Sequence, residues 1–361
     1  MTLATALVTG NDPLPALAEE AVRTAMVKAS LDRPNGVLLF LTPEFARHAP
    51  VVVMAAARVA QCTQVAGGIA SGVFTELGSA LDRPAAAVMV FGDPLSLDSG
   101  DRLGASADPL LCYSSRLAPA ECPATADSVR FGGGFSLGDP LPETFVWQRS
   151  RMSQQQRCCL QISAASIEIA TSSGLQRLGA RLHVDRSNGF DLLQVGGQPA
   201  ARSAHRALPA TMRDHPEALH RLVALHFLDH DHDERFGSPL AIVAVNQDES
   251  LTLSEPLSPG ESIAWAMRDP DTAVCEMAAS AAHARSGNRS PIGALVFSCI
   301  GRGPYFYGGE DRDLKTLRDA LPAMPILGVY GTMQLAPIDG LSSPSSRTLQ
   351  NSVVSAFLYS R

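Results

Sequence analysis

The first ninety residues alternate between amphipathic and continuously apolar segments. Residues 15–31 place apolar side chains at helical spacing, after Asp12 and Pro13, which favour the start of a helix. Gly36 to Leu41 is continuously apolar, the pattern of a strand that is buried on both faces. A second helix, a glycine-rich apolar segment and another strand are predicted over 44–60, Gln64–Phe74 and Ala85–Phe91. Pro50 must lie in the first turn of that second helix or at a break in it.

The middle of the chain has a different pattern. Residues 93–128 are rich in Asp, Pro, Ser and Ala, which predicts loops with one short helix. From Val129 onward, short alternating runs bounded by turn residues predict an antiparallel, meander-like sheet. These runs are VRFGGGF, TFVWQR, CCLQIS, IEIATS, RLHVDR and DLLQVGG.

The rest of the chain mixes helices and strands. Helices are predicted over Pro199–Leu208, Glu217–Phe227, Thr272–Ala284 and Asp313–Ala320. Strands are predicted over Leu240–Val245, Ser262–Met267, Gly293–Cys299, Met324–Pro337 and Ser352–Tyr359. The last hundred residues thus return to the order of elements seen at the start.

Two similar segments suggest an internal duplication. GVLLF begins at Gly36 and GALVF at Gly293, and a glycine-containing strand starts 28 residues after the first, at Gln64, and 32 after the second, at Pro325. A coincidence between two ordinary α/β segments is the alternative. We expect an α+β fold of two related α/β halves, with the meander-like section in the middle and an interdomain cleft. The expected domains are residues 1–200 and 201–361.

Composition narrows the classes of function. The chain has 361 residues, of which 45% are hydrophobic and 18% charged, as in globular proteins with sizeable cores. A net charge of −7 and very few lysines argue against nucleic acid as a partner, because neutralising phosphates needs clustered cations. The apolar runs are too short to span a membrane, and the N-terminus lacks the pattern of a signal peptide. Seven cysteines, including the adjacent Cys158 and Cys159, favour a reducing compartment, so we expect a cytoplasmic protein.

Several motifs together resemble a known family. GALVFSCIGRG (Gly293 to Gly303) and GVYGTMQLAP (Gly328 to Pro337) resemble the C-terminal FIST domain, which has an apolar strand ending in Phe-Ser-Cys, a Gly-Arg-Gly turn and a later glycine-rich stretch. GVLLFLTPEF and VAGGIASGVF are similar to the N-terminal FIST domain, and VGGQPAARS (Val195 to Ser203) resembles the junction between the two. The chain departs from the family at Met333-Gln334, where Gly-Glu is usual, and at Gly196, where Asp is usual.

The resemblance implies a bacterial-type sensory or signal-transduction module that binds a small ligand such as an amino acid. Some FIST proteins resemble haem-binding nitric-oxide sensors that act on a histidine kinase. Haem as a cofactor and a kinase as a partner are therefore an alternative, which rests on the family alone. We expect any signal to pass to a separate partner protein, since the sequence shows no kinase or effector motif.

The candidate ligand-binding residues lie where a buried strand meets a glycine turn. Arg302 offers a planar guanidinium suited to a carboxylate, and glycines let backbone N–H groups approach a ligand. We expect an anionic or zwitterionic ligand, neutralised by Arg302 and oriented by Gln334; a structural ion pair is the alternative for Arg302. The candidate residues are Cys299, Gly301, Arg302, Gly303, Tyr330 and Gln334, with Gly67, Gly68 and Ser71 opposite them.

Catalytic and metal chemistry has weaker signals. HFLDHDHDE (His226 to Glu234) contains three histidines and four acids, and His226 and His230 would share one face of a helix. A solvated, charged helix end explains the same residues. No motif of a serine hydrolase, zinc protease or dinucleotide-binding enzyme occurs. We expect a binding protein with no catalytic residue and no metal site; a cysteine-dependent enzyme built on Cys299, or a metal-dependent one, is the remaining alternative.

Overall fold

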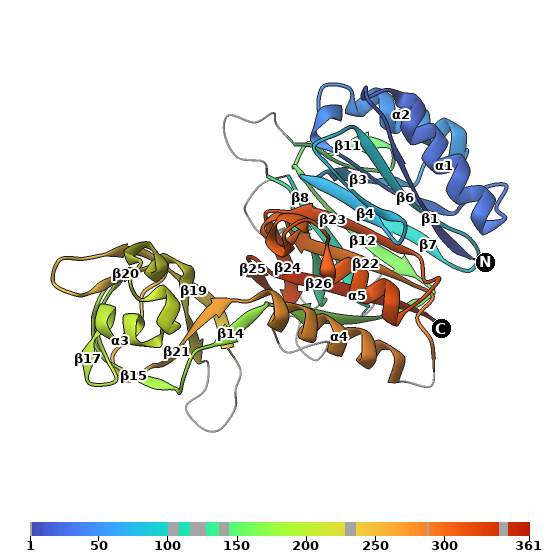
Figure 1. Cartoon of the computed structure of the whole chain (residues 1–361). Coiled ribbons are helices and arrows are strands. Elements are labelled where there is room, and N and C mark those ends of the chain that lie inside the picture. Colours follow the sequence, from blue (N-terminus) through green and yellow to red (C-terminus); the bar gives the residue numbers. More distant parts are fainter. Residues whose placement is uncertain are drawn as a thin grey trace. The chain divides into compact units, whose positions relative to one another are not determined.

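The protein consists of two compact units. The computed structural model describes residues 2–99, 108–115, 128–136, 144–227, 236–286, 289–338 and 346–361. Unit 1 combines Met1–Ser173 with Val274–Arg361, and unit 2 is Gly174–Ala273 (Figure 1). The predicted domain boundary after residue 200 falls inside unit 2, and unit 1 is assembled from both ends of the chain.

Strands dominate the structure, with 44% strand against 25% helix. The expected α+β fold of two duplicated halves with a meander-like middle was therefore wrong. The runs predicted to form the meander are strands, but they are distributed over four different sheets. Alternation of apolar and polar residues specifies a strand and its buried face, whereas the partner strand depends on residues far away in the sequence.

Sheet A of unit 1 has the strand order β1-β6-β2-β3-β10-β11, with β2 parallel to β3 and the other pairs antiparallel. Helices α1 (Pro15–Ala29) and α2 (Ala49–Ala60) cover one face (Figure 1) and bury small side chains such as Ala21 and Val53 against it. Pro50 lies in the first turn of α2, as its missing N–H allows. The strands are β1 Leu3–Thr9, β2 Gly36–Leu41, β3 Val65–Ile69, β6 Ala85–Phe91, β10 Val146–Gln148 and β11 Arg151–Met152.

Sheet B has the order β13-β26-β22-β23-β4-β5, again with a parallel pair at its centre, β22 and β23. Helices α4 (Pro270–Ser286) and α5 (Arg312–Ala320) contribute Met277, Ala281, Leu314 and Leu317 to the apolar cluster on its outer face. The strands are β4 Gly72–Thr75, β5 Gly78–Leu81, β13 Ala165–Ser172, β22 Gly293–Cys299, β23 Ile326–Gly331 and β26 Val353–Ser360.

Sheet C has the order β25-β24-β9-β8-β12-β7, with β8 parallel to β9. Two of its strands, β7 and β8, lie in the region 93–128 that we predicted to be loops with a short helix, so that prediction was wrong there. The strands are β7 Ser96–Ser99, β8 Leu110–Ser114, β9 Arg130–Gly134, β12 Arg157–Ser163, β24 Met333–Pro337 and β25 Ser346–Leu349.

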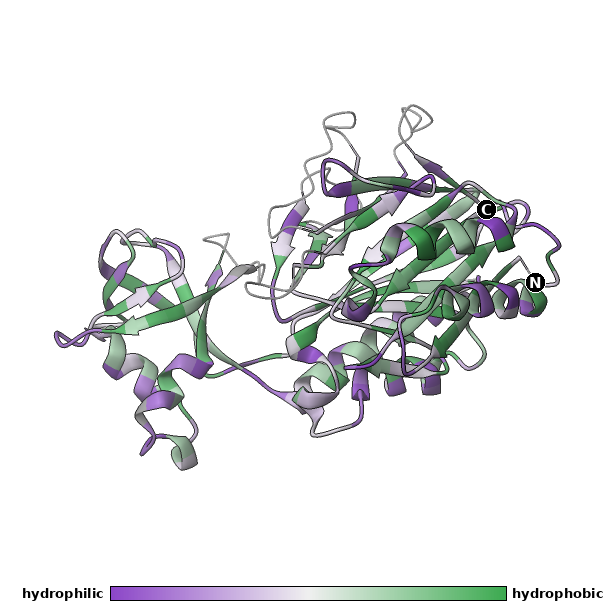
Figure 2. Ribbon diagram, turned by 90° about the horizontal axis from the view of Figure 1, so that it is seen from above, coloured by the Kyte–Doolittle hydropathy of each residue, from purple (hydrophilic) through white to green (hydrophobic). Residues whose placement is uncertain are grey.

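Sheets A, B and C share one apolar core. Each sheet contributes buried residues to it, and apolar positions dominate the strands that surround it (Figure 2). At its centre, the ring of Phe40 lies 5.7 Å from Phe135, 5.9 Å from Tyr113 and 6.5 Å from Phe297, centroid to centroid, in edge-to-face geometry. Such pairs stabilise a core by about 0.5–1.5 kcal/mol each beyond the area they bury.

Unit 2 is a closed barrel. Strand β21 pairs with both β15 and β18, which closes a ring of six strands in the order β21-β15-β16-β20-β19-β18. Strands β14 and β17 are added to it, and helix α3 (Ala200–Ala207) packs against its core, where Nε1 of Trp265 donates to Oγ of Ser203 at 3.1 Å. The strands are β14 Leu175–Arg177, β15 Leu182–Asn188, β16 Asp191–Val195, β17 Gln198–Pro199, β18 Leu222–Phe227, β19 Phe236–Val245, β20 Leu251–Leu253 and β21 Ser262–Arg268.

The helix predicted over Glu217–Phe227 was wrong. Residues Pro216–Arg221 form a short 3-10 helix, and Leu222–Phe227 form strand β18. The sequence LVALHF is apolar except for His226, a pattern that a largely buried strand can also have, and pairing with β19 and β21 on both sides decides the outcome.

Candidate ligand-binding site

The carboxyl ends of β22 and β23 hold most of the residues predicted to bind a ligand. Strand β22 ends at Cys299, a short 3-10 helix over Ile300–Arg302 with Gly301 at its middle follows, and β23 ends at Gly331. Cys299 is buried, and its thiol donates a long hydrogen bond of 3.8 Å to Oδ1 of Asn351. It is a small buried side chain at this position rather than an exposed thiol.

Arg302 lies inside unit 1, with its side chain fully buried. Nε and Nη2 donate to the carboxylate of Asp313 at 2.9–3.2 Å, while Nη1 donates to the backbone oxygen of Ser172 at 3.0 Å. Nη2 also donates to Oγ of Ser172 at 2.9 Å. A two-pronged pair of this kind neutralises the guanidinium and fixes its plane. The structure therefore contains the structural ion pair and does not support Arg302 as the anchor of a ligand anion.

Two carboxylates and a phenol complete this buried network. Tyr330 donates its hydroxyl to Oδ2 of Asp311 at 2.5 Å, and Oδ1 of Asp311 accepts the N–H of Leu314 at 3.0 Å, which caps the start of α5. Burial raises the pKa of Asp313 to about 6, although the neighbouring Arg302 opposes the shift. Burial also raises the pKa of Asp311 and that of Tyr330. These groups satisfy one another inside the protein.

The structure brings three of the predicted residues together around one aromatic ring. The backbone N–H of Ser71 donates to the backbone oxygen of Tyr330 at 3.0 Å, and the next residue, Gly72, lies opposite Tyr330 in the β4–β23 pair. A Cβ at Gly72 would lie 2.9 Å from Cδ2 of the ring, and one at Gly303 would lie 3.2 Å from Cε1. The ring fills the space that these glycines leave, so we assign them to packing.

The two other predicted glycines also serve close packing. Gly67 has φ of +150°, and a Cβ there would meet the backbone oxygen of Leu39 at 1.7 Å, so the pairing of β2 with β3 requires glycine at this position. A Cβ at Gly68 would lie 3.0 Å from the ring of Phe135. Close packing was the alternative that the sequence left open for these residues.

Gln334 differs from the other predicted residues. It lies in β24, is fully buried, and sits opposite Gly133 of β9 and Leu349 of β25. Neither Oε1 nor Nε2 has a hydrogen-bond partner among the described residues. A polar group buried without a partner costs about 1–3 kcal/mol, and such groups are few in native proteins. The role of Gln334 in orienting a ligand stays a prediction, now with an unused amide to motivate it.

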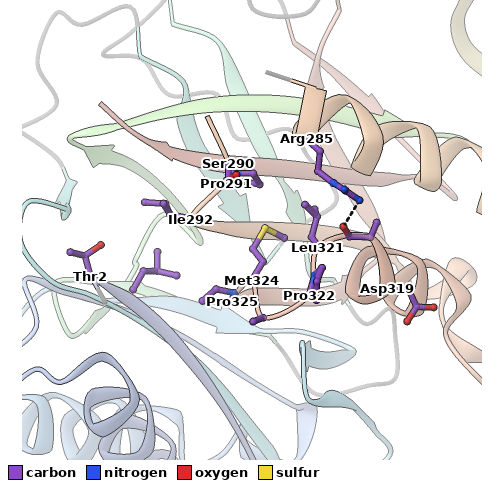
Figure 3. Close-up of a pocket in the computed structure, with 13 residues that line it drawn as sticks. Thr2, Arg285, Ser290, Pro291, Ile292, Asp319, Leu321, Pro322, Met324 and Pro325 are labelled. Carbon is purple, nitrogen blue, oxygen red and sulfur yellow. Dashed lines mark hydrogen bonds between the residues drawn. The ribbon is translucent and has the colours of Figure 1, made fainter. Parts of the chain in front are cut away.

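A cavity of about 710 Å³ lies at the opposite, amino ends of β22 and β23 (Figure 3). The last turn of α4, the segment 289–292 before β22, the turn between α5 and β23 and the start of β1 form its walls. The apolar part of its lining includes Leu3, Ile292, Leu321, Met324 and Pro325, and Thr2, Arg285, Ser290 and Asp319 are its polar residues.

Arg285 is the cation among the residues that line this cavity. It lies in the last turn of α4, where a positive charge complements the helix dipole. Nη1 donates to the backbone oxygen of Ala320 at 3.1 Å, and we find no second hydrogen bond from its guanidinium within the described ranges (Figure 3). Asp319 instead forms an ion pair with Lys315 one turn earlier on α5. The cavity therefore offers an exposed guanidinium with spare donors beside an apolar surface.

Sequence reasoning missed this cavity because its residues come from four separate segments. The signals that were present are indirect. Arg285 directly follows the helix predicted over Thr272–Ala284, Pro291 lies two residues before a predicted strand, and Pro325 is the second residue of another. These signals mark where elements begin and end, but they give no indication that the loops enclose space.

The described part of the histidine and acid cluster does not form a metal site. His226 lies in strand β18 rather than on a helix, so the expected spacing on one helical face is lost, and its Nε2 lies 3.6 Å from Oε1 of Glu261. Residues 228–235, which complete the histidine and acid cluster, lie outside the described residues. Among the residues that are described, no group of three or more His, Cys, Asp or Glu side chains is arranged to hold a metal ion.

Comparison with protein families finds a match to the FIST C domain over residues 200–335. This match supports a likeness to FIST family proteins over that part of the chain. It covers α3 and the barrel strands β18 to β21 of unit 2, and the part of unit 1 from α4 into β24. The similarity to an N-terminal FIST domain stays a prediction from the motifs.

Similar proteins occur in mycobacteria. Over 175 residues the chain is 22% identical to the uncharacterized protein Rv0628c of Mycobacterium tuberculosis strain H37Rv, covering 47% of this chain and 46% of that protein. Over 176 residues it is 23% identical to the uncharacterized protein Mb0898c of Mycobacterium bovis, covering 47% and 45%. The aligned region thus spans about half the length of these relatives. Within the described part of this chain, no helix is long and apolar enough to cross a membrane.

Proposed function

We propose that the protein is a non-enzymatic sensory module that binds a small carboxylate, such as an apolar amino acid, in the cavity at the amino ends of β22 and β23. The observation that carries this proposal is the cavity itself. Its volume of about 710 Å³ falls in the range of about 300–1,000 Å³ that is typical of small-molecule sites. All of its lining residues except Thr2 and Leu3 lie within the segment that matches the FIST C domain.

The chemistry of the lining suggests the class of ligand. An apolar surface formed by Leu321, Met324 and Pro325 suits an aliphatic or aromatic side chain. The guanidinium of Arg285 has donors to spare for a carboxylate, which it can bind through two parallel hydrogen bonds. Asp319 lies at the same cavity and is ion-paired with Lys315, so an ammonium group of the ligand would have to compete with that lysine for its carboxylate.

Binding at this position suggests a route for the signal. The cavity is lined by the segments that lead into β22 and β23, and these strands continue to the buried ion pair of Arg302 and Asp313 at their carboxyl ends. A ligand that draws Arg285 away from Ala320 would shift the end of α4 relative to the end of α5. A separate partner, such as a histidine kinase, would then read this shift.

Thermal denaturation in the presence of candidate ligands tests the proposal. A panel of the standard amino acids and small aliphatic and aromatic carboxylates is added to the full chain, and the melting temperature is followed by fluorescence. A compound at 100 times its Kd should stabilise the protein by about 2.7 kcal/mol. Arg285→Ala should weaken binding of an active compound by roughly 10-fold to 100-fold, since a hydrogen bond to a charged group contributes about 1.5–3 kcal/mol.

The control is Arg318→Ala. Arg318 is also an exposed arginine, but it lies in α5 and does not line the cavity. It should leave the affinity unchanged. An active compound whose affinity is equal in the wild type, Arg285→Ala and Arg318→Ala would contradict the proposed site, and a panel without any active compound would contradict the ligand class. A stoichiometric Soret band from protein purified with a haem precursor would instead favour the haem-sensor alternative.

A further inference from the structure

Two cysteines face each other across sheet C. Cys112 of β8 and Cys159 of β12 are directly opposite in the antiparallel register of these strands. Their Sγ atoms are 2.9 Å apart. Both side chains are buried, Cys112 completely, while Cys159 keeps 8% of its surface exposed. Each cysteine that the structure describes is in the free thiol form.

This pair is separated from the neighbouring Cys158 by the alternation of the strand. Cys112 and Cys159 belong to a small apolar cluster with Leu110 and Leu335 on one face of sheet C. Cys158 points to the opposite face, into the central core of unit 1. The adjacency of Cys158 and Cys159 in the sequence therefore does not bring their thiols together, whereas Cys112, 47 residues earlier, lies in contact with Cys159.

We propose that Cys112 and Cys159 are a redox-active dithiol that a peroxide oxidises to a cross-strand disulfide. The sulfur of Cys159, the more accessible of the two, attacks one oxygen of the peroxide and breaks the O–O bond. With hydrogen peroxide as the oxidant, the products are a sulfenic acid at Cys159 and one molecule of water. The thiol of Cys112 then attacks that sulfur and displaces the hydroxyl group as a second water. Two thiols lose two protons and two electrons, and the peroxide is reduced to two molecules of water.

The backbone already has the geometry that the bond needs. Directly opposite residues in antiparallel strands have Cα atoms about 4.5–5.5 Å apart. Disulfides form over Cα separations of about 4.4–6.8 Å, so the bond can form without moving either strand. In reducing compartments, such bonds are usually transient and serve catalysis or redox sensing. The pair thus adds an oxidative input to unit 1 that is independent of the ligand cavity.

Cys158 provides a matched control. It is the preceding residue of the same strand and is 1% exposed, and burial raises its pKa to about 12, which keeps it in the unreactive thiol form at neutral pH. Replacing it by serine removes a thiol from the same strand without touching the Cys112–Cys159 pair.

The experiment treats the reduced full chain with hydrogen peroxide, then counts thiols in denaturant and maps disulfide-linked peptides by mass spectrometry. The wild type has seven cysteines, and we expect five thiols after oxidation, with Cys112 linked to Cys159. Cys158→Ser should fall from six thiols to four. Cys112→Ser should keep six thiols or form only a sulfenic acid at Cys159. A reductant such as dithiothreitol should restore the original counts.

Retention of all seven thiols in the wild type after peroxide treatment would overturn the proposal. A peptide map that links Cys159 to any residue other than Cys112 would also overturn it. Circular dichroism checks that each variant is folded, and the map of the wild type decides the matter even if a variant fails to fold.

Discussion

The two ends of the parallel strands β22 and β23 differ in whether their charged side chains are buried and paired or exposed. At the carboxyl ends, Arg302, Asp313, Asp311 and Tyr330 form a buried network in which each named group has a partner inside the protein. At the amino ends, Arg285 lies exposed beside a cavity of about 710 Å³, and among the described residues its one hydrogen-bond partner is the backbone oxygen of Ala320. Each end has an arginine: Arg302 is buried and already paired with a carboxylate of the protein, whereas Arg285 is exposed.

This difference shows how far a motif can predict a site. The sequence Gly-Arg-Gly after a buried strand has the residue types of an anion site, and ligands in α/β folds commonly bind at the carboxyl ends of strands. Here the carboxylate that Arg302 binds is Asp313 of the same chain. The motif correctly predicted an arginine that binds a carboxylate, but that carboxylate belongs to the protein and not to a ligand.

The largest effect on stability should come from breaking the buried network at the carboxyl ends of β22 and β23. Arg302→Met leaves Asp313 buried without its cation, and we expect it to lower the free energy of unfolding by about 3–5 kcal/mol, as measured by urea denaturation. The double variant Arg302→Met with Asp313→Leu should recover most of this loss. A wild-type stability in Arg302→Met would show that the ion pair does not hold this end together.

The pH dependence of stability should report the same pair. The folded pKa of Asp313 is raised to about 6 from an ordinary value of 3.8, so the folded state binds the proton more tightly than the unfolded state. This contribution to stability is fully present below about pH 3.8 and is lost as pH rises through about 6. It is on the order of 2–3 kcal/mol, since one unit of pKa corresponds to about 1.4 kcal/mol.

The measurement compares urea denaturation of the wild type and of Asp313→Asn between pH 4 and pH 8. The difference in unfolding free energy between them should fall as pH rises to about 6 and then stay level. A difference that is constant over the whole range would show that Asp313 is ionised throughout.

Gln334 of β24 tests whether every buried polar group in this region has a hydrogen-bond partner. Gln334→Leu removes two buried polar atoms that have no partner among the described residues, so it should raise the free energy of unfolding by about 1–3 kcal/mol. Gln161→Leu is the matched control. Gln161 is also buried in sheet C, but its Nε2 donates to Oδ2 of Asp108 at 3.1 Å, so its replacement should lower stability. A loss of stability in Gln334→Leu would reveal a partner for this amide.

The smallest effect on stability should come from a substitution at the amino ends of β22 and β23, beside the cavity. Arg285→Ala removes an exposed side chain with one hydrogen bond, so the free energy of unfolding should change by no more than about 0.5 kcal/mol in the absence of ligand. Urea denaturation of Arg285→Ala beside Arg302→Met gives the comparison directly. A loss of several kcal/mol in Arg285→Ala would mean that the amino end is as tightly built as the carboxyl end.

The local elements were largely predictable, whereas their assembly was not. Helices α1, α2, α4 and α5 and the apolar strands β2, β6, β22 and β26 appear where periodicity placed them, because each carries its own buried face. The three-sheet core of unit 1 depends on pairings such as β4 with β23 and β10 with β3, and the barrel of unit 2 on the pairing of β21 with β15, all of which join segments far apart in the chain.

The candidate site divides in the same way. Ser71, Gly303 and Tyr330 do come together, because the glycine-containing segments pair as strands. Whether a polar side chain is free or already paired depends on tertiary contacts, such as those of Arg302 with Ser172 and Asp313, and spacing carries no information about them. The cavity depends on where loops meet, and for that reason no motif pointed to it.

The most direct test of the account is a crystal structure of the protein with the most stabilising compound from the thermal panel. We predict electron density for the compound in the cavity lined by Met324 and Pro325, with its carboxylate on Arg285 and with the Arg302–Asp313 pair intact. Density at the carboxyl ends of β22 and β23, with Arg302 turned from Asp313 to the compound, would contradict the account.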